Sequence, residues 1–120
     1  MKYALLIYAT PGASERPAAE LSEAWLDYVR AVRDSGVLVA AEQLTGTDTA
    51  TCVRVRGGDR LLTDGPFMET KEHLLGFFLI DVPDLDAALD WAATMPNTAH
   101  GTTEVRAAVS GRPWQALLDS

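Results

Sequence analysis

The sequence has little of the material from which recognisable active sites are usually built. Its 120 residues include one cysteine, Cys52, and two histidines, His73 and His100. A single cysteine excludes an internal disulfide framework and suits a reducing compartment, so we expect a cytoplasmic protein. The chain contains no His-x-His, His-x-x-x-His or Cys-x-x-Cys spacing and no glycine-rich phosphate loop. The sequence therefore predicts neither a metal site nor a cofactor.

Long apolar runs are also missing. The run at residues 37–41 is far too short to span a bilayer. The apolar residues 3–8 are soon followed by Pro11 and Gly12, with no clear cleavage site of a signal peptide. We therefore expect no membrane partner.

Basic residues are few. Lys and Arg number 10 against 17 Asp and Glu, which gives a net charge of -7 and a pI of about 4.6. A chain of this charge is repelled by phosphate backbones. The local cluster of Arg54, Arg56 and Arg60 is most simply a set of solvated side chains on a hairpin. We therefore expect no nucleic-acid partner.

What the chain does have is the composition and periodicity of one folded domain. Hydrophobic residues make up 48% of a 12.9 kDa chain, which is enough to form a core without the support of disulfides or metals. Apolar patterns predict strands at 2–8, 37–44, 50–56, 60–63, 75–82 and 103–109, and two helices. The first helix begins near Pro17 and carries Tyr28 and Val32 on its apolar face, and the second begins near Asp84, its expected N-cap. The order β-α-β-β-(β)-β-α-β predicts the α+β class and a ferredoxin-like split βαβ fold with an extra hairpin strand.

A fold of this kind carries both helices on one face of its sheet. The other face has no helix to cover it, although residues 37–41 and 77–80 are strongly apolar. An uncovered apolar face predicts a partner, and the simplest is a second copy packed sheet against sheet. The apolar tail residues Trp114, Leu117 and Leu118 would extend this contact of a homodimer.

Polar chemistry is concentrated in the connection at residues 63–73. Pro66 restricts Gly65, for which we expect extended geometry. Asp64 can accept a hydrogen bond from the backbone two residues on, which would hold its carboxylate rigidly. Asp64 is therefore either a catalytic carboxylate or only the cap of the turn. Phe67 either fixes the loop to the core or forms part of a ligand platform.

Glu42 follows small and apolar residues on a strand that we expect to be central. It is a candidate general acid or base if it points into a sheet face, and a solvated side chain if the strand frays there. His73 and His100 are either catalytic or loop-end and capping residues. The candidate catalytic residues are Glu42, Asp64, His73 and His100, and the candidate substrate-binding residues are Tyr28, Pro66, Phe67, Glu69 and Lys71.

Several segments together resemble the DGPF branch of the YCII-related family. They are Leu38-Val39-Ala40-Ala41-Glu42, Thr63-Asp64-Gly65-Pro66-Phe67-Met68-Glu69-Thr70-Lys71-Glu72, Gly76-Phe77, Asp81-Val82-Pro83-Asp84-Leu85-Asp86-Ala87-Ala88 and His100-Gly101-Thr102-Thr103-Glu104-Val105-Arg106. The resemblance covers residues 1–109, which we take as the domain, and leaves residues 110–120 as a tail. It implies a ferredoxin-like fold that dimerises as an α/β barrel with a pocket beside each sheet.

The resemblance leaves the activity open. Many members of the family have no assigned activity, some occur beside or fused to sigma factors, and a few relatives are enzymes acting on small aromatic or chlorinated compounds. Smaller members pair a histidine of the first helix with an aspartate, but here that helix has no histidine, and Trp25 and Tyr28 occupy its inner face. Ala41 stands where the DGPF pattern usually has glycine before Glu42.

Two hypotheses of function follow. One is a homodimeric small-molecule pocket protein with cofactor-free acid-base chemistry of the lyase, isomerase or cyclase type. The other is a non-catalytic ligand-sensing or protein-interaction module linked to transcriptional control. The sequence does not decide whether the protein is an enzyme.

Overall fold

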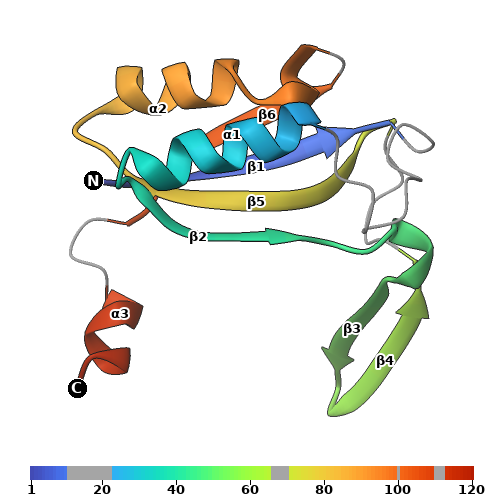
Figure 1. Ribbon diagram of the computed structural model, residues 1–120. Helices are drawn as coiled ribbons and strands as arrows, with labels where there is room; N and C mark the ends of the chain where they lie inside the picture. Colours follow the sequence, from blue (N-terminus) through green and yellow to red (C-terminus); the bar gives the residue numbers. More distant parts are fainter. Residues whose placement is uncertain (11–22, 66–70, 100, 110–112) are drawn as a thin grey trace.

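The fold is built on one four-stranded antiparallel sheet with the strand order β2-β5-β1-β6. The computed structural model describes residues 1–10, 23–65, 71–99, 101–109 and 113–120. The sheet contains β1 (Lys2–Ala9), β2 (Leu38–Gln43), β5 (His73–Asp81) and β6 (Thr102–Ala107). Strand β5 is antiparallel to both β1 and β2, so β1 and β2 run parallel with β5 between them. This arrangement confirms the predicted ferredoxin-like α+β fold (Figure 1).

Two helices, α1 (Glu23–Asp34) and α2 (Leu85–Ala93), cover the same face of this sheet (Figure 1). The side chain of Asp84 accepts a hydrogen bond from the backbone N–H of Ala87 at 2.9 Å, which confirms Asp84 as the N-cap of α2. A short 3-10 helix, η2 (Pro96–Ala99), leads from α2 toward β6. No helix in the described ranges combines the length and the apolar character that crossing a membrane requires.

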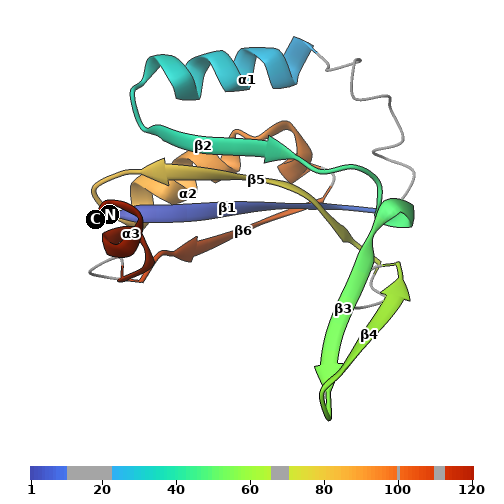
Figure 2. The same ribbon diagram turned by 90° about the horizontal axis from the view of Figure 1, so that it is seen from below.

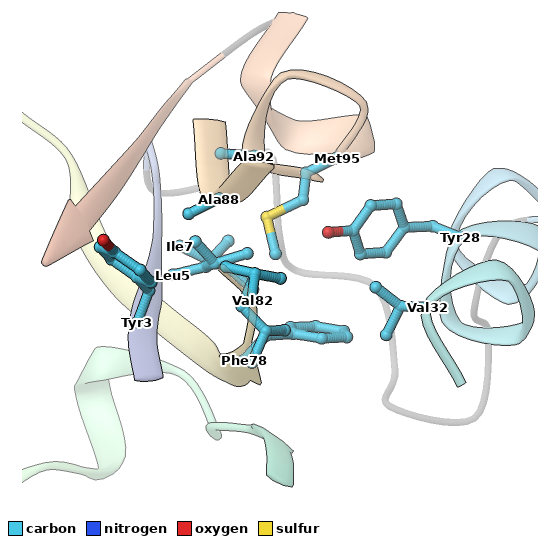
Figure 3. Packing of buried hydrophobic residues seen from close by; sticks show 11 residues of the cluster. Tyr3, Leu5, Ile7, Tyr28, Val32, Phe78, Val82, Ala88, Ala92 and Met95 are labelled. Atoms are coloured by element: carbon cyan, nitrogen blue, oxygen red, sulfur yellow. The ribbon is translucent and has the colours of Figure 1, made fainter. Parts of the chain in front are cut away.

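The core lies between these helices and the sheet. Burial alternates along β1, and Leu5 and Ile7 are among the residues that point toward the helices. From α1, Tyr28 and Val32 reach toward the side chains of the sheet, and the Tyr28 ring meets Phe78 edge-on with the ring centroids 5.5 Å apart (Figure 3). Strand alternation therefore sends one set of apolar side chains into a single packed layer.

The opposite side of the sheet, which we call the open face, has no helix of the described chain against it (Figure 1). The strand register places four half-buried or exposed apolar residues across its middle strands, Ala4 and Leu6 of β1 and Phe77 and Leu79 of β5. Its outer strands carry polar side chains. These are Glu42 of β2 and Glu104 and Arg106 of β6.

Two further elements stand apart from the sheet. The hairpin of β3 (Thr51–Arg56) and β4 (Asp59–Asp64) forms its own two-stranded sheet after the 3-10 helix η1 (Thr47–Thr49). The tail, for which no helix was predicted, forms the short helix α3 (Pro113–Leu118). Both elements project on the side of the open face and lie at opposite ends of the strands (Figures 1 and 2).

The chain exposes more surface than its mass requires. Its accessible surface is 8590 Å², against roughly 6,300 Å² for a compact monomer of 12.9 kDa. Its radius of gyration is 16.2 Å, against about 14 Å for a compact domain of this length. The hairpin and α3 contribute to this surplus of about 2,300 Å², because almost all their residues are exposed.

The burial pattern predicts which leucine side chains contribute most to the free energy of unfolding. Leu5→Ala removes a side chain that is 0% exposed, so we expect the free energy of unfolding to fall by about 2–5 kcal/mol. The matched control is Leu85→Ala on α2, where the side chain is 49% exposed and the loss should stay below about 1 kcal/mol. Urea denaturation of the two variants measures the difference. Equal losses would contradict the core described above.

Candidate functional site

A polar cluster on the open face joins the first and last strands of the sheet. The Tyr8 hydroxyl donates a hydrogen bond to Glu104 Oε1 at 3.3 Å, although the two residues lie 96 positions apart in the sequence. Arg106 follows two residues later on the same face of β6, opposite Ala4. The open face therefore presents a hydroxyl, a carboxylate and a guanidinium beside its apolar middle.

The ionisation of Tyr8 follows from these neighbours. Partial burial raises the pKa of the Tyr8 hydroxyl above its ordinary value of 10.0, and the negative charge of Glu104 and the hydrogen bond to it raise it further. The positive charge of Arg106 acts in the opposite direction. The phenol therefore stays protonated at neutral pH, and Tyr8 serves this face as a hydrogen-bond donor.

Glu42 lies within β2, directly opposite Phe77, and its side chain is exposed. The register continues from Phe77 to Leu6 and from Leu6 to Glu104, so Glu42 and Glu104 stand in one row at opposite edges of the open face. Three strand spacings separate them, about 14 Å. The prediction of a central strand was wrong, because β2 lies at the edge of the sheet, but the strand is not frayed at Glu42 and the carboxylate projects from a paired backbone.

Gly76 allows β2 to approach β5 closely beside Glu42. A Cβ atom at Gly76 would come within 2.6 Å of the backbone oxygen of Glu42. Any larger residue would push the two strands apart at this point. The position of Glu42 therefore depends on the absence of a side chain on its neighbour.

His73 occupies the first position of β5 and is half-buried, with its Nδ1 2.8 Å from Thr47 Oγ1. It pairs with Ala9, which belongs to the helix-covered side of the sheet. Along β5 it is four residues from Phe77, or about 13 Å. One chain by itself therefore does not bring Glu42 and His73 onto the same face.

Asp64 is the last residue of β4, at the base of the hairpin, and is exposed. Its neighbour Gly65 donates a backbone hydrogen bond to Ala50 at 2.8 Å and accepts one from Cys52 Sγ at 3.2 Å. The prediction of extended geometry for Gly65, based on its place before Pro66, was wrong. Its φ is +94°, in a region of backbone conformation that favours glycine. The backbone next to Asp64 is therefore held in place, and the Cys52 thiol has a structural bond.

Tyr28 is buried between the helices, on the opposite side of the sheet from Glu42. Its hydroxyl donates to the backbone oxygen of Trp91 at 2.8 Å, and burial raises the pKa of the phenol. This bond ties α1 to the end of α2, so a ligand would have to compete with it for the hydroxyl.

The other predicted site residues give less information. Lys71 is exposed just before β5. Four predicted residues lie outside the described residues, namely Pro66, Phe67, Glu69 and His100. Within the described part of the chain, no three His, Cys, Asp or Glu side chains gather as metal ligands would.

Sequence reasoning did not single out Tyr8, Glu104 or Arg106. The alternation of Glu104, Val105 and Arg106 in a strand was a local signal that two charges share one face. Nothing local indicated that Tyr8 would stand beside Glu104, because that contact depends on which strand pairs with which.

Comparison with known proteins agrees with the resemblance in the sequence. Residues 1–112 match the YCII-related domain. An uncharacterised protein of Rhizobium meliloti (strain 1021) is 38% identical over 112 residues, which cover 88% of this chain and 90% of that protein.

The Tyr8 cluster can be tested by titration of its phenol. Glu104→Gln removes a negative charge and should lower the pKa of Tyr8, whereas Arg106→Gln removes a positive charge and should raise it. The phenolate absorbance, after subtraction of the curve of a Tyr8→Phe variant, isolates this residue from Tyr3 and Tyr28. An unchanged or higher pKa in Glu104→Gln would show that the two side chains do not interact.

Proposed function

Because the chain belongs to the YCII-related family, we propose that it acts as a homodimer whose two open faces enclose a pocket for a small molecule. The observation that carries the proposal is the make-up of the open face, an apolar middle with a few charged and hydroxyl groups at its edges. Small-molecule sites typically have this composition. The Asp64-Gly65-Pro66-Phe67 segment supports membership of the DGPF branch.

A second copy would resolve two physical problems of the isolated chain. The middle of the open face carries Leu6, Phe77 and Leu79, whose burial would be worth about 25 cal/mol for each Å² removed from water. Two chains together have a surplus surface of about 4,600 Å², which falls within the total area that the interfaces of obligate dimers bury. Two sheets packed face to face would form the α/β barrel that the family resemblance implies.

The chemistry supported best is acid-base catalysis without a cofactor. Glu42 is a carboxylate able to take a proton from a substrate and return it at another atom, as an isomerase, lyase or cyclase step requires. Tyr8 and Arg106 lie at the opposite edge of the open face from Glu42, so they would bind a distant oxygen or anionic group of the same ligand and orient it toward Glu42. The remaining candidates would join the pocket only if the second copy places them beside it. They are Asp64, His73, His100, Lys71 and the rest of the loop. The single free thiol supports a cytoplasmic location.

A second function is favoured by one specific observation. Helix α3 exposes Trp114, Leu117 and Leu118 at 85%, 75% and 77%. Such a helix suits a protein-interaction or ligand-sensing module linked to transcriptional regulation. Substitution at Glu42 separates the two functions, because Glu42→Gln should weaken ligand binding in the pocket but leave capture of a regulatory partner by α3 in place.

The pocket is tested by substitution of its carboxylates. A simple phenol suits this face as a probe, because its ring fits the apolar middle and Glu42 can accept a hydrogen bond from its hydroxyl. Glu42→Gln keeps the size of the side chain but loses its charge, so binding of neutral phenols should weaken roughly tenfold or more. Calorimetry with a panel of simple phenols measures this, and Glu23→Gln, at an exposed position of α1, is the matched control. If the affinity is unchanged in both Glu42→Gln and Asp64→Asn, or if no phenol binds the unmodified protein, the proposed pocket is wrong.

A further inference from the structure

The β3–β4 hairpin has an apolar side that the chain itself does not cover. Val53 pairs directly with Leu62, and Val55, two residues along, shares the same side of the hairpin. These three side chains are 59%, 60% and 61% exposed in the order Val53, Leu62, Val55. A lone two-stranded hairpin is at best marginally stable in water, so this side needs a partner surface.

Helix α3 also has an apolar face that the described chain does not cover. Trp114, Leu117 and Leu118 are spaced i, i+3 and i+4, which puts them on one helix face, and all three are exposed. A helix of six residues is too short to be stable without packing. The chain therefore contains two short elements, each with one uncovered apolar surface.

Within one chain these two surfaces cannot meet. The hairpin follows the end of β2, and α3 follows the end of β6, at the other end of the strands (Figures 1 and 2). The eight residues of β1 run between these ends, about 26 Å. Both elements nevertheless project on the side of the open face, where a second copy would lie.

We propose that the β3–β4 hairpin of each copy packs against α3 of the other copy, so that two identical contacts close the ends of the homodimer. A two-fold axis that crosses the strands would place each hairpin over the partner's α3. Each hairpin strand has six residues, about 20 Å, and packed sheets lie about 10 Å apart, so the hairpin is long enough to reach past the partner's sheet. We call this contact the clasp.

Charge also favours the clasp. Arg60 pairs with Val55 and so shares the apolar side of the hairpin. Near the end of α3, Asp119 supplies a carboxylate, and the helix C-terminus itself attracts positive charge. Arg54 and Arg56 lie on the other side of the hairpin, paired with Leu61 and Asp59, so Arg60 is the basic side chain that would face an acidic surface of the second copy.

The inference rests on the proposed homodimer and is tested by a disulfide. The variant Leu62→Cys/Leu117→Cys is made in a Cys52→Ser background, which removes the native thiol, and is oxidised gently. We expect most of the protein to become a covalent dimer of twice the chain mass. The matched control, Leu62→Cys/Leu85→Cys, places the second thiol on α2 at an exposed site and should stay uncrosslinked.

The outcomes separate the clasp from the homodimer. Sedimentation of the reduced variant shows whether two copies associate at all. A reduced dimer whose thiols do not crosslink, or a disulfide within one chain, would overturn the clasp and leave the homodimer standing. An unmodified protein that sediments as a monomer would overturn both.

Replacement of two apolar residues by an oppositely charged pair checks the same contact without relying on disulfide geometry. Leu62→Glu or Leu117→Arg alone would place one charge in an apolar contact, which should raise the dimer dissociation constant at least about tenfold. The two substitutions together should restore most of the affinity, because the charges then face each other across the two chains. If the double variant loses as much dimerisation free energy as the two single variants added together, the two surfaces do not meet.

Discussion

The constraint on which this structure depends is that its sheet has apolar side chains on both faces, whereas the helices of the described chain cover only one of them. Helices α1 and α2 bury Leu5, Ile7 and Ile80 on one side. On the other side, Leu6, Phe77 and Leu79 are only half-buried, and no helix of the described chain packs against them. Alternation along a strand sends every second side chain outward, and in the middle strands of this sheet several of these outward residues are apolar. The hairpin and α3 project on the uncovered side, and their exposed apolar side chains would also be stabilised by a partner.

The face that needs a partner is also the face with chemistry on it. Strand pairing brings Tyr8 to Glu104 and aligns Glu42 with Phe77, so a hydroxyl, two carboxylates and the Arg106 guanidinium border an apolar floor. If a second copy covers this floor, the charged groups at its edges would lose water and interact more strongly. Association and ligand binding would thus draw on the same surface, and a change at Phe77 would affect both.

Local patterns in the sequence were enough for most of the fold and less of the site. The helix period predicted Tyr28 and Val32 in the core, and Asp84 was correctly predicted as a cap. The short α3 was not predicted, because apolar residues in a six-residue segment give no clear period. The site depends on register. Glu42 and His73 point to opposite faces because β5 pairs with both β1 and β2, and Tyr8 meets Glu104 because β6 pairs with β1. Long-range pairing of this kind leaves no mark in a single sequence.

The central claim, that two copies share their open faces, is tested most directly by the mass of the protein in solution. Sedimentation at micromolar concentration should give twice 12.9 kDa for the unmodified protein. Phe77→Lys should shift it to the single-chain mass, because it puts a charge in the middle of the open face. Leu85→Lys, on the helix layer, should leave the dimer intact. A folded unmodified protein that sediments as a monomer, or a dimer indifferent to Phe77→Lys, would contradict the account.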